Sequence, residues 1–202
     1  MAALQLGIMP TDKGVVVFRK AQSDCIFVIE DKNRPRFWYS IDPVTKGPAA
    51  ITAELRREAA SITRPGNEVQ GEGDMRVFTH SNFEADPAYE ETFFRYPNYR
   101  LTLTSLYWDK LGNVGVAVKG DEQLDRVYRG HSLPHIGLAK APKTHWTDVG
   151  ALVELGERAL KGWVQNELGG DGVFFHQRHG LYKKALNWVT VGAATTHLQP
   201  SL

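Results

Sequence analysis

The chain has 202 residues, of which 42% are hydrophobic and 23% charged, and its formal net charge is +1 at pH 7. These proportions are those of an ordinary globular protein. A net charge so close to zero excludes a global field that draws the protein to nucleic acids or membranes, so a site for polyanions must come from local clusters. The single cysteine, Cys25, excludes an internal disulfide framework and favours a reducing, cytoplasmic compartment.

The hydropathy pattern argues against membrane insertion. No apolar run reaches the roughly 18 residues that a transmembrane helix needs. The N-terminal segment lacks a basic region followed by an apolar core, so no signal peptide is expected.

The first half of the chain predicts strands around one clear helix. Short runs rich in β-branched and aromatic residues predict strands over 14–20, 24–31, 35–42 and 74–83. The first two runs are close enough to form a hairpin. Residues 49–62 are rich in Ala, Glu and Arg, with Ile51, Leu55 and Ile62 at helical spacing, and predict a helix. A polar Gly/Pro loop over 63–73 follows it.

The second half predicts more strands than helices. Short helices are expected over 86–96 and 122–129, and a long amphipathic helix over 144–164 with its N-cap near Thr147 and Asp148. Alternating or β-branched runs predict strands over 99–109, 114–120, 135–141, 172–178 and 186–198. The chain is therefore predicted to be α+β, with a mainly antiparallel sheet and flanking helices. We divide it into an N-terminal hairpin extension, residues 1–34, and a main domain, residues 35–202.

His135 stands out because of the residue before it. His131 and His135 have helical spacing, but a proline at position 134 costs a helix about 3 kcal/mol. The residue before proline is also pushed towards an extended conformation. His135 is therefore predicted at the start of a strand.

The order of elements around His80 and His135 resembles the two-histidine (2H) phosphoesterase family. Each motif of that family reads His-apolar-Ser/Thr-apolar, on two adjacent strands. The corresponding segments here are His135-Ile136-Gly137-Leu138, preceded by Pro134, and His80-Ser81-Asn82-Phe83. The resemblance covers residues 37–138 and continues less clearly into the closing strands.

The resemblance implies a metal-independent phosphodiesterase that needs no cofactor. His80 and His135 would be the acid/base pair, acting on an RNA 2′,3′-cyclic end or on a 2′-5′-linked or cyclic nucleotide. One imidazole takes a proton from the attacking oxygen and the other protonates the leaving oxygen, and a pKa near 6.5 suits both roles. The phosphate would be bound by Ser81, Asn82 and Gly137.

Two departures from the family pattern favour an alternative without cleavage. The hydroxyl residue two positions after each histidine is Asn82 in the first motif and Gly137 in the second. An Asn amide can still donate to a phosphate oxygen, but Gly137 offers only its backbone. The alternative is a catalytically degenerate 2H fold that binds nucleotides or RNA.

A second resemblance suggests a structural role. The segments over 133–142, 146–150 and 186–198 resemble parts of the pol polyproteins of fish and amphibian retroelements, upstream of the reverse transcriptase. This resemblance implies a structural or interaction domain of a polyprotein.

The remaining candidates have simpler explanations. His176 and His179 have a spacing that could suit a metal, but an exposed loop pair explains them better, and no HExxH or CxxC pattern predicts a zinc site. The basic residues fit scattered solvated charge better than one basic rim. Trp108 and the other strand aromatics are more often core residues than base-stacking platforms.

Overall fold

The structure, a computed structural model, describes residues 6–11, 14–19, 23–29, 48–71, 75–79, 98–120, 133–166 and 170–198. Its helices are α1 (Pro48–Ile62) and α4 (Trp146–Arg158). Its strands are β1 (Leu6–Thr11), β2 (Gly14–Arg19), β3 (Ser23–Ile29), β4 (Glu68–Val69), β5 (Met75–Thr79), β6 (Asn98–Asp109), β7 (Val114–Lys119), β8 (His135–Lys140), β9 (Trp163–Gln165), β10 (Val173–His176) and β11 (Leu181–Leu198).

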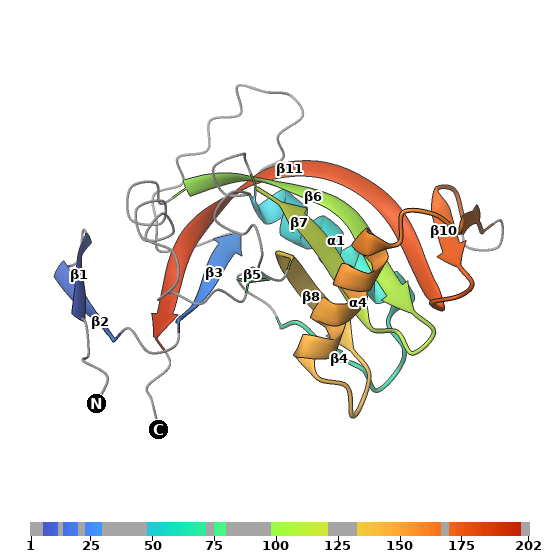
Figure 1. The fold of residues 1–202 in the computed structure, drawn as a ribbon, viewed down its shortest axis with the longest axis horizontal. Helices are drawn as coiled ribbons and strands as arrows, with labels where there is room; N and C mark the ends of the chain where they lie inside the picture. Colours follow the sequence, from blue (N-terminus) through green and yellow to red (C-terminus); the bar gives the residue numbers. More distant parts are fainter. Residues whose placement is uncertain are drawn as a thin grey trace.

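Nine strands form one antiparallel sheet with the order β3-β5-β8-β7-β6-β11-β10-β9, and β4 pairs with β8. β11 is long enough to pair first with β6, as far as Ala193, and then with β3. This second pairing closes β3, β5, β8, β7, β6 and β11 into a ring, while β10 and β9 extend beyond it (Figure 1). β1 and β2 pair with each other as a separate two-stranded sheet.

The predicted α+β class with a mainly antiparallel sheet and flanking helices is confirmed. The predicted hairpin between residues 14–20 and 24–31 is wrong, because β2 pairs with β1 while β3 pairs with β5 and β11. The apolar run that forms β3 is of the kind that suits a strand with neighbours on both sides. β3 lies within the predicted extension 1–34 and is nevertheless bonded to the main sheet.

Several predicted elements lie outside the described residues. These are the strand over 35–42 and the short helices over 86–96 and 122–129. Neither of the two helices that the structure does describe is both long and apolar enough to cross a membrane.

Helix α1 packs an aliphatic stripe against one face of the sheet. Ile51, Leu55 and Ala59 recur every four residues and are at most 1% exposed. They share the larger core cluster with strand residues such as Val116 and Ile136. Burying each large aliphatic side chain contributes about 1.5–3 kcal/mol. This face of the sheet is therefore held by bulky apolar side chains.

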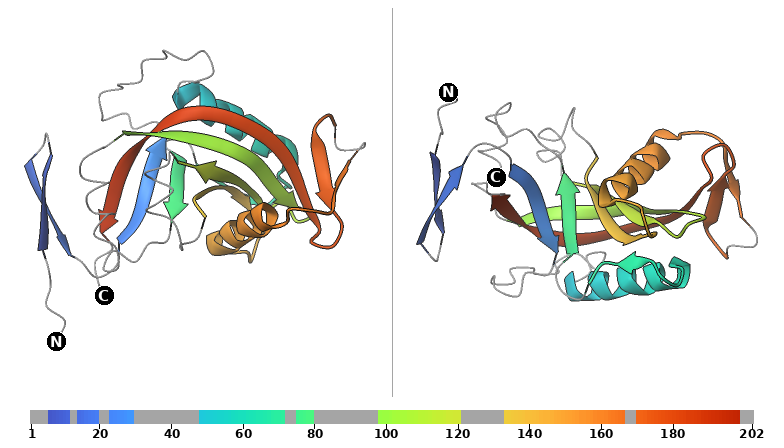
Figure 2. Two further views of the ribbon diagram at one scale, coloured as in Figure 1. Left: turned by 45° about the horizontal axis from the view of Figure 1, so that its top comes forward. Right: turned by 90° about the horizontal axis from the view of Figure 1, so that it is seen from below.

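Helix α4 covers the opposite face (Figure 2), and here two strand glycines make room for the helix. A Cβ atom added at Gly115 of β7 would lie 2.6 Å from a methyl group of Val153. One added at Gly137 of β8 would lie 2.7 Å from the indole of Trp146. Helix side chains therefore occupy the space that strand side chains would otherwise fill.

Two glycines of α4 make the reverse contact, in which a strand side chain lies against the helix backbone. A Cβ atom at Gly150 would lie 2.6 Å from Cε1 of His135, and one at Gly156 would overlap the ring of Tyr107. Strand rings thus fit against a bare stretch of helix, and helix side chains fit against bare stretches of strand. We call these four positions the glycine contacts.

Helix α4 is shorter than the predicted helix over 144–164. It begins after His145, the N-cap residue, whose backbone N–H donates to Asp148 Oδ2 at 2.8 Å. The expectation that Thr147 caps the helix is wrong, because Thr147 already lies in its first turn. The helix ends at Arg158, and the indole Nε1 of Trp163 then donates to the Ala159 carbonyl at 2.5 Å. This bond satisfies a carbonyl that has no partner within the helix.

The substitution Gly156→Ala tests the close packing of α4. In an exposed helix, alanine is more stable than glycine by about 1 kcal/mol. Because a Cβ atom at Gly156 meets Tyr107, we expect Gly156→Ala instead to lower the free energy of unfolding by about 1–3 kcal/mol in urea denaturation. The matched control is Ala151→Gly at an exposed position of the same helix, which should cost only the propensity difference. A more stable Gly156→Ala protein would contradict this packing.

Candidate functional site

His135 is the first residue of β8, as predicted, and lies between β5 and β7. Its backbone pairs with Phe78 on one side and Ala117 on the other. The side chain is 7% exposed, and its Nδ1 lies 3.0 Å from the Leu133 carbonyl. A carbonyl only accepts, so Nδ1 carries the proton. The ring packs against Gly150, and α4 therefore covers it on that side.

His80, Ser81 and Asn82, the other predicted motif, lie outside the described residues. β5 ends at Thr79, one residue before His80, and pairs with β8 through Phe78 and His135. The strand that leads to His80 is therefore the direct neighbour of the strand that begins with His135.

Gly137, a predicted phosphate-binding residue, faces the first turn of α4. A Cβ atom there would lie 2.7 Å from Cε3 and 3.0 Å from Cζ3 of Trp146. The indole of Trp146 therefore occupies the space that a side chain at position 137 would need. Trp146 in turn lies beneath the Lys140 ammonium, whose Nζ is 5.9 Å from the ring centre.

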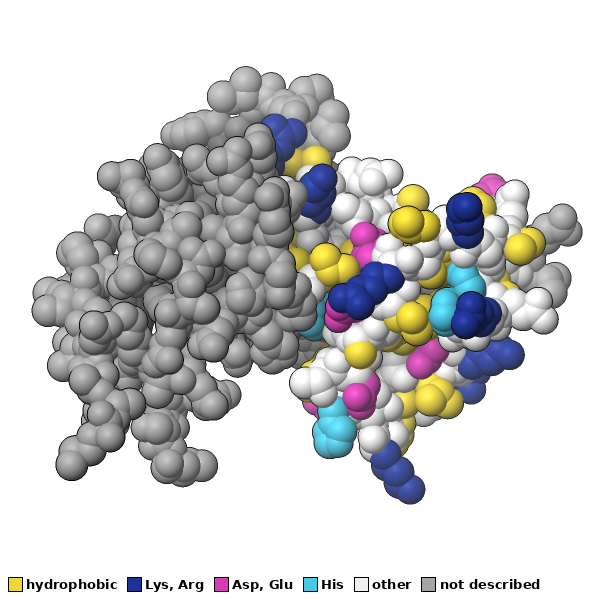
Figure 3. Space-filling model, viewed as in Figure 1, with side chains coloured by type: hydrophobic (Ala, Val, Ile, Leu, Met, Phe, Trp, Pro, Cys, Tyr) yellow, Lys and Arg dark blue, Asp and Glu magenta, His cyan; other side chains and the backbone are white. Residues whose placement is uncertain are grey.

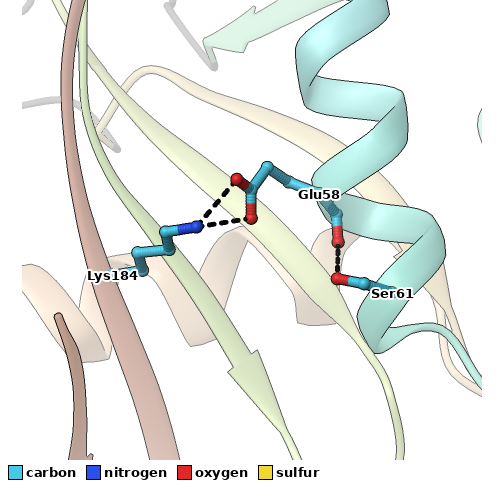
Figure 4. A network of polar contacts seen from close by, with 3 residues as sticks. All are labelled: Glu58, Ser61 and Lys184. Carbon is cyan, nitrogen blue, oxygen red and sulfur yellow. Dashed lines mark hydrogen bonds and ion pairs between the residues drawn. The ribbon is translucent and has the colours of Figure 1, made fainter. Parts of the chain in front are cut away.

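The basic side chains do not form one continuous rim on the face drawn in Figure 3, where they are interspersed with acidic and apolar ones. Lys140 pairs with Glu68 at 2.6 Å, and a hydrogen bond from this ammonium holds the pKa of Glu68 below its usual value. Lys184 of β11 pairs with both carboxylate oxygens of Glu58 in α1, at 2.7 and 2.8 Å (Figure 4). These two lysines join neighbouring elements to each other.

Aromatic side chains form a row across the outer strands of the sheet. The register places Val164 of β9, Phe175 of β10, Tyr182 of β11 and Trp108 of β6 side by side on one face. The rings of Phe175 and Tyr182 are 4.7 Å apart, and those of Tyr182 and Trp108 are stacked at 5.5 Å. All three rings are partly exposed, and Lys110 Nζ lies 6.0 Å from the Phe175 ring. We call these three rings the aromatic row.

The sequence interpretation of His176 and His179 as an exposed loop pair is wrong. His176 ends β10 and is only 6% exposed, while His179 lies half-buried in the turn to β11. Their ring centres are 4.4 Å apart. The strand predicted over 172–178 already contained His176, and a side chain inside a strand is more readily buried than one in a loop.

Within the described ranges, no three His, Cys, Asp or Glu side chains come together as metal ligands. The one described half of the predicted acid/base pair, His135, is packed between strands and helix. The partly exposed groups that could meet a ligand lie instead at the far end of the sheet, on β9, β10 and β11.

Gly137→Thr tests whether position 137 belongs to a phosphate site or to the packing of α4. Because Trp146 fills the space, we expect the substitution to lower the free energy of unfolding by about 1–3 kcal/mol. Adding Trp146→Ala should recover part of this loss, so the two effects should fail to add by more than about 0.5 kcal/mol in a double-mutant cycle. Strictly additive effects would show that the two residues do not interact.

A scan against models of known protein families found no match, and a search of curated proteins found no similar chain.

Proposed function

We propose that the chain is a 2H phosphoesterase-like domain that binds single-stranded RNA or a nucleotide without cleaving it. The departures at Asn82 and Gly137 support the loss of cleavage, because they remove both hydroxyls that the family uses at the phosphate. The enclosure of His135 by Gly150 and of Gly137 by Trp146 supports it further. A phosphate group has no room between these strand residues and α4.

The aromatic row is the observation that carries the binding proposal. Stacking on aromatic side chains is how proteins hold unpaired bases without regard to sequence, and each stacked base contributes about 1–3 kcal/mol. Phe175, Tyr182 and Trp108 lie on three neighbouring strands. Because Tyr182 and Trp108 stack on each other, a base can stack only on the ring surface that this contact leaves open. At one end of the row, Trp108 packs against the core that α1 covers. The other end lies beside Val164, which is 67% exposed.

The charges around the row favour a polyanion over an apolar partner. Lys110 lies over the Phe175 ring, and Lys183 lies on the other face of the same sheet, 5.5 Å from the Tyr107 ring. No ion pair joins either lysine to a carboxylate within the described residues. Phosphates of a strand that stacks on the row would meet the ammonium of Lys110, whereas Lys183 serves only the opposite face.

Phe175→Ala and Tyr182→Ala test the row. Each should weaken the binding of a labelled single-stranded oligoribonucleotide by roughly 5- to 150-fold, the equivalent of one lost stacking contact. The measurement is fluorescence anisotropy at fixed ionic strength. The matched control is Phe174→Ala, which removes a 37% exposed ring from the opposite face of the same strand and should leave affinity unchanged. Equal losses in all three variants would place the binding surface elsewhere.

A second candidate is the metal-independent phosphodiesterase with His80 and His135 as acid and base. The observation in its favour is the direct pairing of β5 with β8, which brings the strand that leads to His80 beside His135. Two imidazoles on neighbouring strands are what an in-line displacement at phosphorus needs, provided that both reach one phosphate.

Cleavage of 2′,3′-cyclic nucleotides and 2′-5′ oligoadenylate tests this candidate. If the chain is an enzyme, His80→Ala and His135→Ala should each lower the rate by about 10²–10⁴, and EDTA should leave it unchanged. Because His135 is buried against Gly150, the stability of that variant must be measured alongside its rate. Absence of cleavage in the unmodified protein would favour binding alone. Absence of both activities would favour a structural domain of a retroelement-type polyprotein.

A further inference from the structure

The end of the sheet opposite β3 carries a hollow that the proposed function does not use. It is open to solvent, has a volume of about 720 Å³, and is formed by the segment after α4 and by the turn between β10 and β11. Its lining includes Lys161 and Gly162 from the first segment and His176, Arg178 and His179 from the second. His176 and the aromatic row lie on opposite faces, because Phe175 and His176 are consecutive residues of one strand.

His176 is built into this hollow by specific contacts. Its Nε2 lies 2.9 Å from the Lys161 carbonyl, which only accepts, so Nε2 carries a proton. The edge of Trp163 covers the ring on one side, at 5.2 Å between ring centres. Gly162 has φ +92°, and a Cβ atom there would lie 2.9 Å from Nε2, so a side chain at this position would press on the histidine.

The other ring nitrogen of His176, Nδ1, is buried in a residue that is only 6% exposed. It forms no hydrogen bond with any part of the chain that the structure describes. Leaving a buried polar atom unpaired destabilises the folded chain. With the proton on Nε2, Nδ1 is an acceptor, so a ligand that carries a hydroxyl, such as hydrogen phosphate, can donate a hydrogen bond to it.

The positively charged side chains around the hollow favour an anionic ligand. Lys161 and Arg178 are exposed, and no described carboxylate pairs with either of them. Partial desolvation, and then the neighbouring His176 and Arg178, lower the pKa of His179 below its usual value. A bound anion would reverse the effect of Arg178 and favour the protonated form of His179. A metal cation would instead be repelled by Lys161 and Arg178.

Two further charged groups face this end of the sheet. Lys183 lies over the Trp163 ring at 5.7 Å, and it adds to the positive charge. Glu157 accepts a hydrogen bond from the Tyr107 hydroxyl at 2.7 Å, so that carboxylate is already engaged.

We propose that this hollow is a binding site for a dianionic oxyanion of the hydrogen phosphate type, held by Arg178, Lys161 and His179, with Nδ1 of His176 as a buried acceptor for its hydroxyl. The site shares no residue with the aromatic row or with His80 and His135. Its test is therefore separate from the tests of the proposed function.

Inorganic phosphate is the first probe, titrated into the full chain by calorimetry at constant ionic strength. We expect saturable binding that Arg178→Ala and Lys161→Ala each weaken by about tenfold, as loss of a hydrogen bond to a charged group predicts. The matched control is Lys143→Ala, an exposed cation in the turn after β8, which should leave affinity unchanged. Absence of saturable binding, or equal affinity in all variants, would overturn the proposal. Tight binding of Zn²⁺ in place of phosphate would also overturn it.

Sulfate is the second probe, because it stays doubly charged across the pH range. Affinity for sulfate should rise several-fold from pH 8 to pH 6 as His179 becomes protonated. His179→Gln should remove most of this rise without unfolding the chain, because His179 is only half-buried. A pH-independent affinity would contradict the assigned role of His179.

A third experiment distinguishes a phosphate group on an RNA end from a free oxyanion. A 5′-phosphorylated tetranucleotide is compared with the same tetranucleotide without its phosphate. One outcome is that the phosphorylated form binds more tightly, and that Arg178→Ala removes this preference while Phe175→Ala keeps it. This outcome identifies the hollow as a receptor for an RNA end. Binding of inorganic phosphate with no preference between the two tetranucleotides identifies it as a site for a free oxyanion.

Discussion

The close approach of α4 to the sheet depends on the absence of four Cβ atoms. At the glycine contacts, Gly115 and Gly137 on the strands receive helix side chains, while Gly150 and Gly156 on the helix receive strand rings. Protein interiors are packed densely enough that one extra methyl group at such a contact forces a shift. The position of α4 then determines two further features. It covers His135, and it places the chain after Arg158 beside the end of β10.

The two faces of the sheet are organised on different physical principles. α1 is held by bulky aliphatic side chains and by the Lys184–Glu58 ion pair (Figure 4), whereas α4 adds the glycine contacts to a smaller apolar cluster that includes Leu152 and Val153. Both helices cover the strands of the ring, and β10 and β9 project beyond it (Figure 1). Side chains at this end remain partly exposed on both faces, with aromatic rings on one and histidines with cations on the other.

Local patterns in the sequence predicted where helices and strands lie better than which of them contact each other. Ile51 and Leu55 at helical spacing located α1, and Pro134 located the start of β8, because both signals depend only on neighbouring residues. The partners of β3 and the cover over Gly137 depend on residues distant in the chain, and no local pattern reports them. The rings that Gly150 and Gly156 meet, His135 and Tyr107, are likewise distant from them in the chain. His176 was misjudged because its burial comes from Lys161 and Trp163.

The closure of the ring by β11 and β3 has a consequence for how the chain folds. Ser23 pairs with Leu198, so this pairing joins segments from almost opposite ends of the described chain. Forming contacts so distant in sequence has a large entropic cost of loop closure, so these contacts form slowly. During synthesis β3 is made long before β11, and until β11 follows, one side of β3 is an open strand edge that other chains can extend. By pairing with β3, β11 therefore covers this edge and protects the chain against edge-to-edge aggregation.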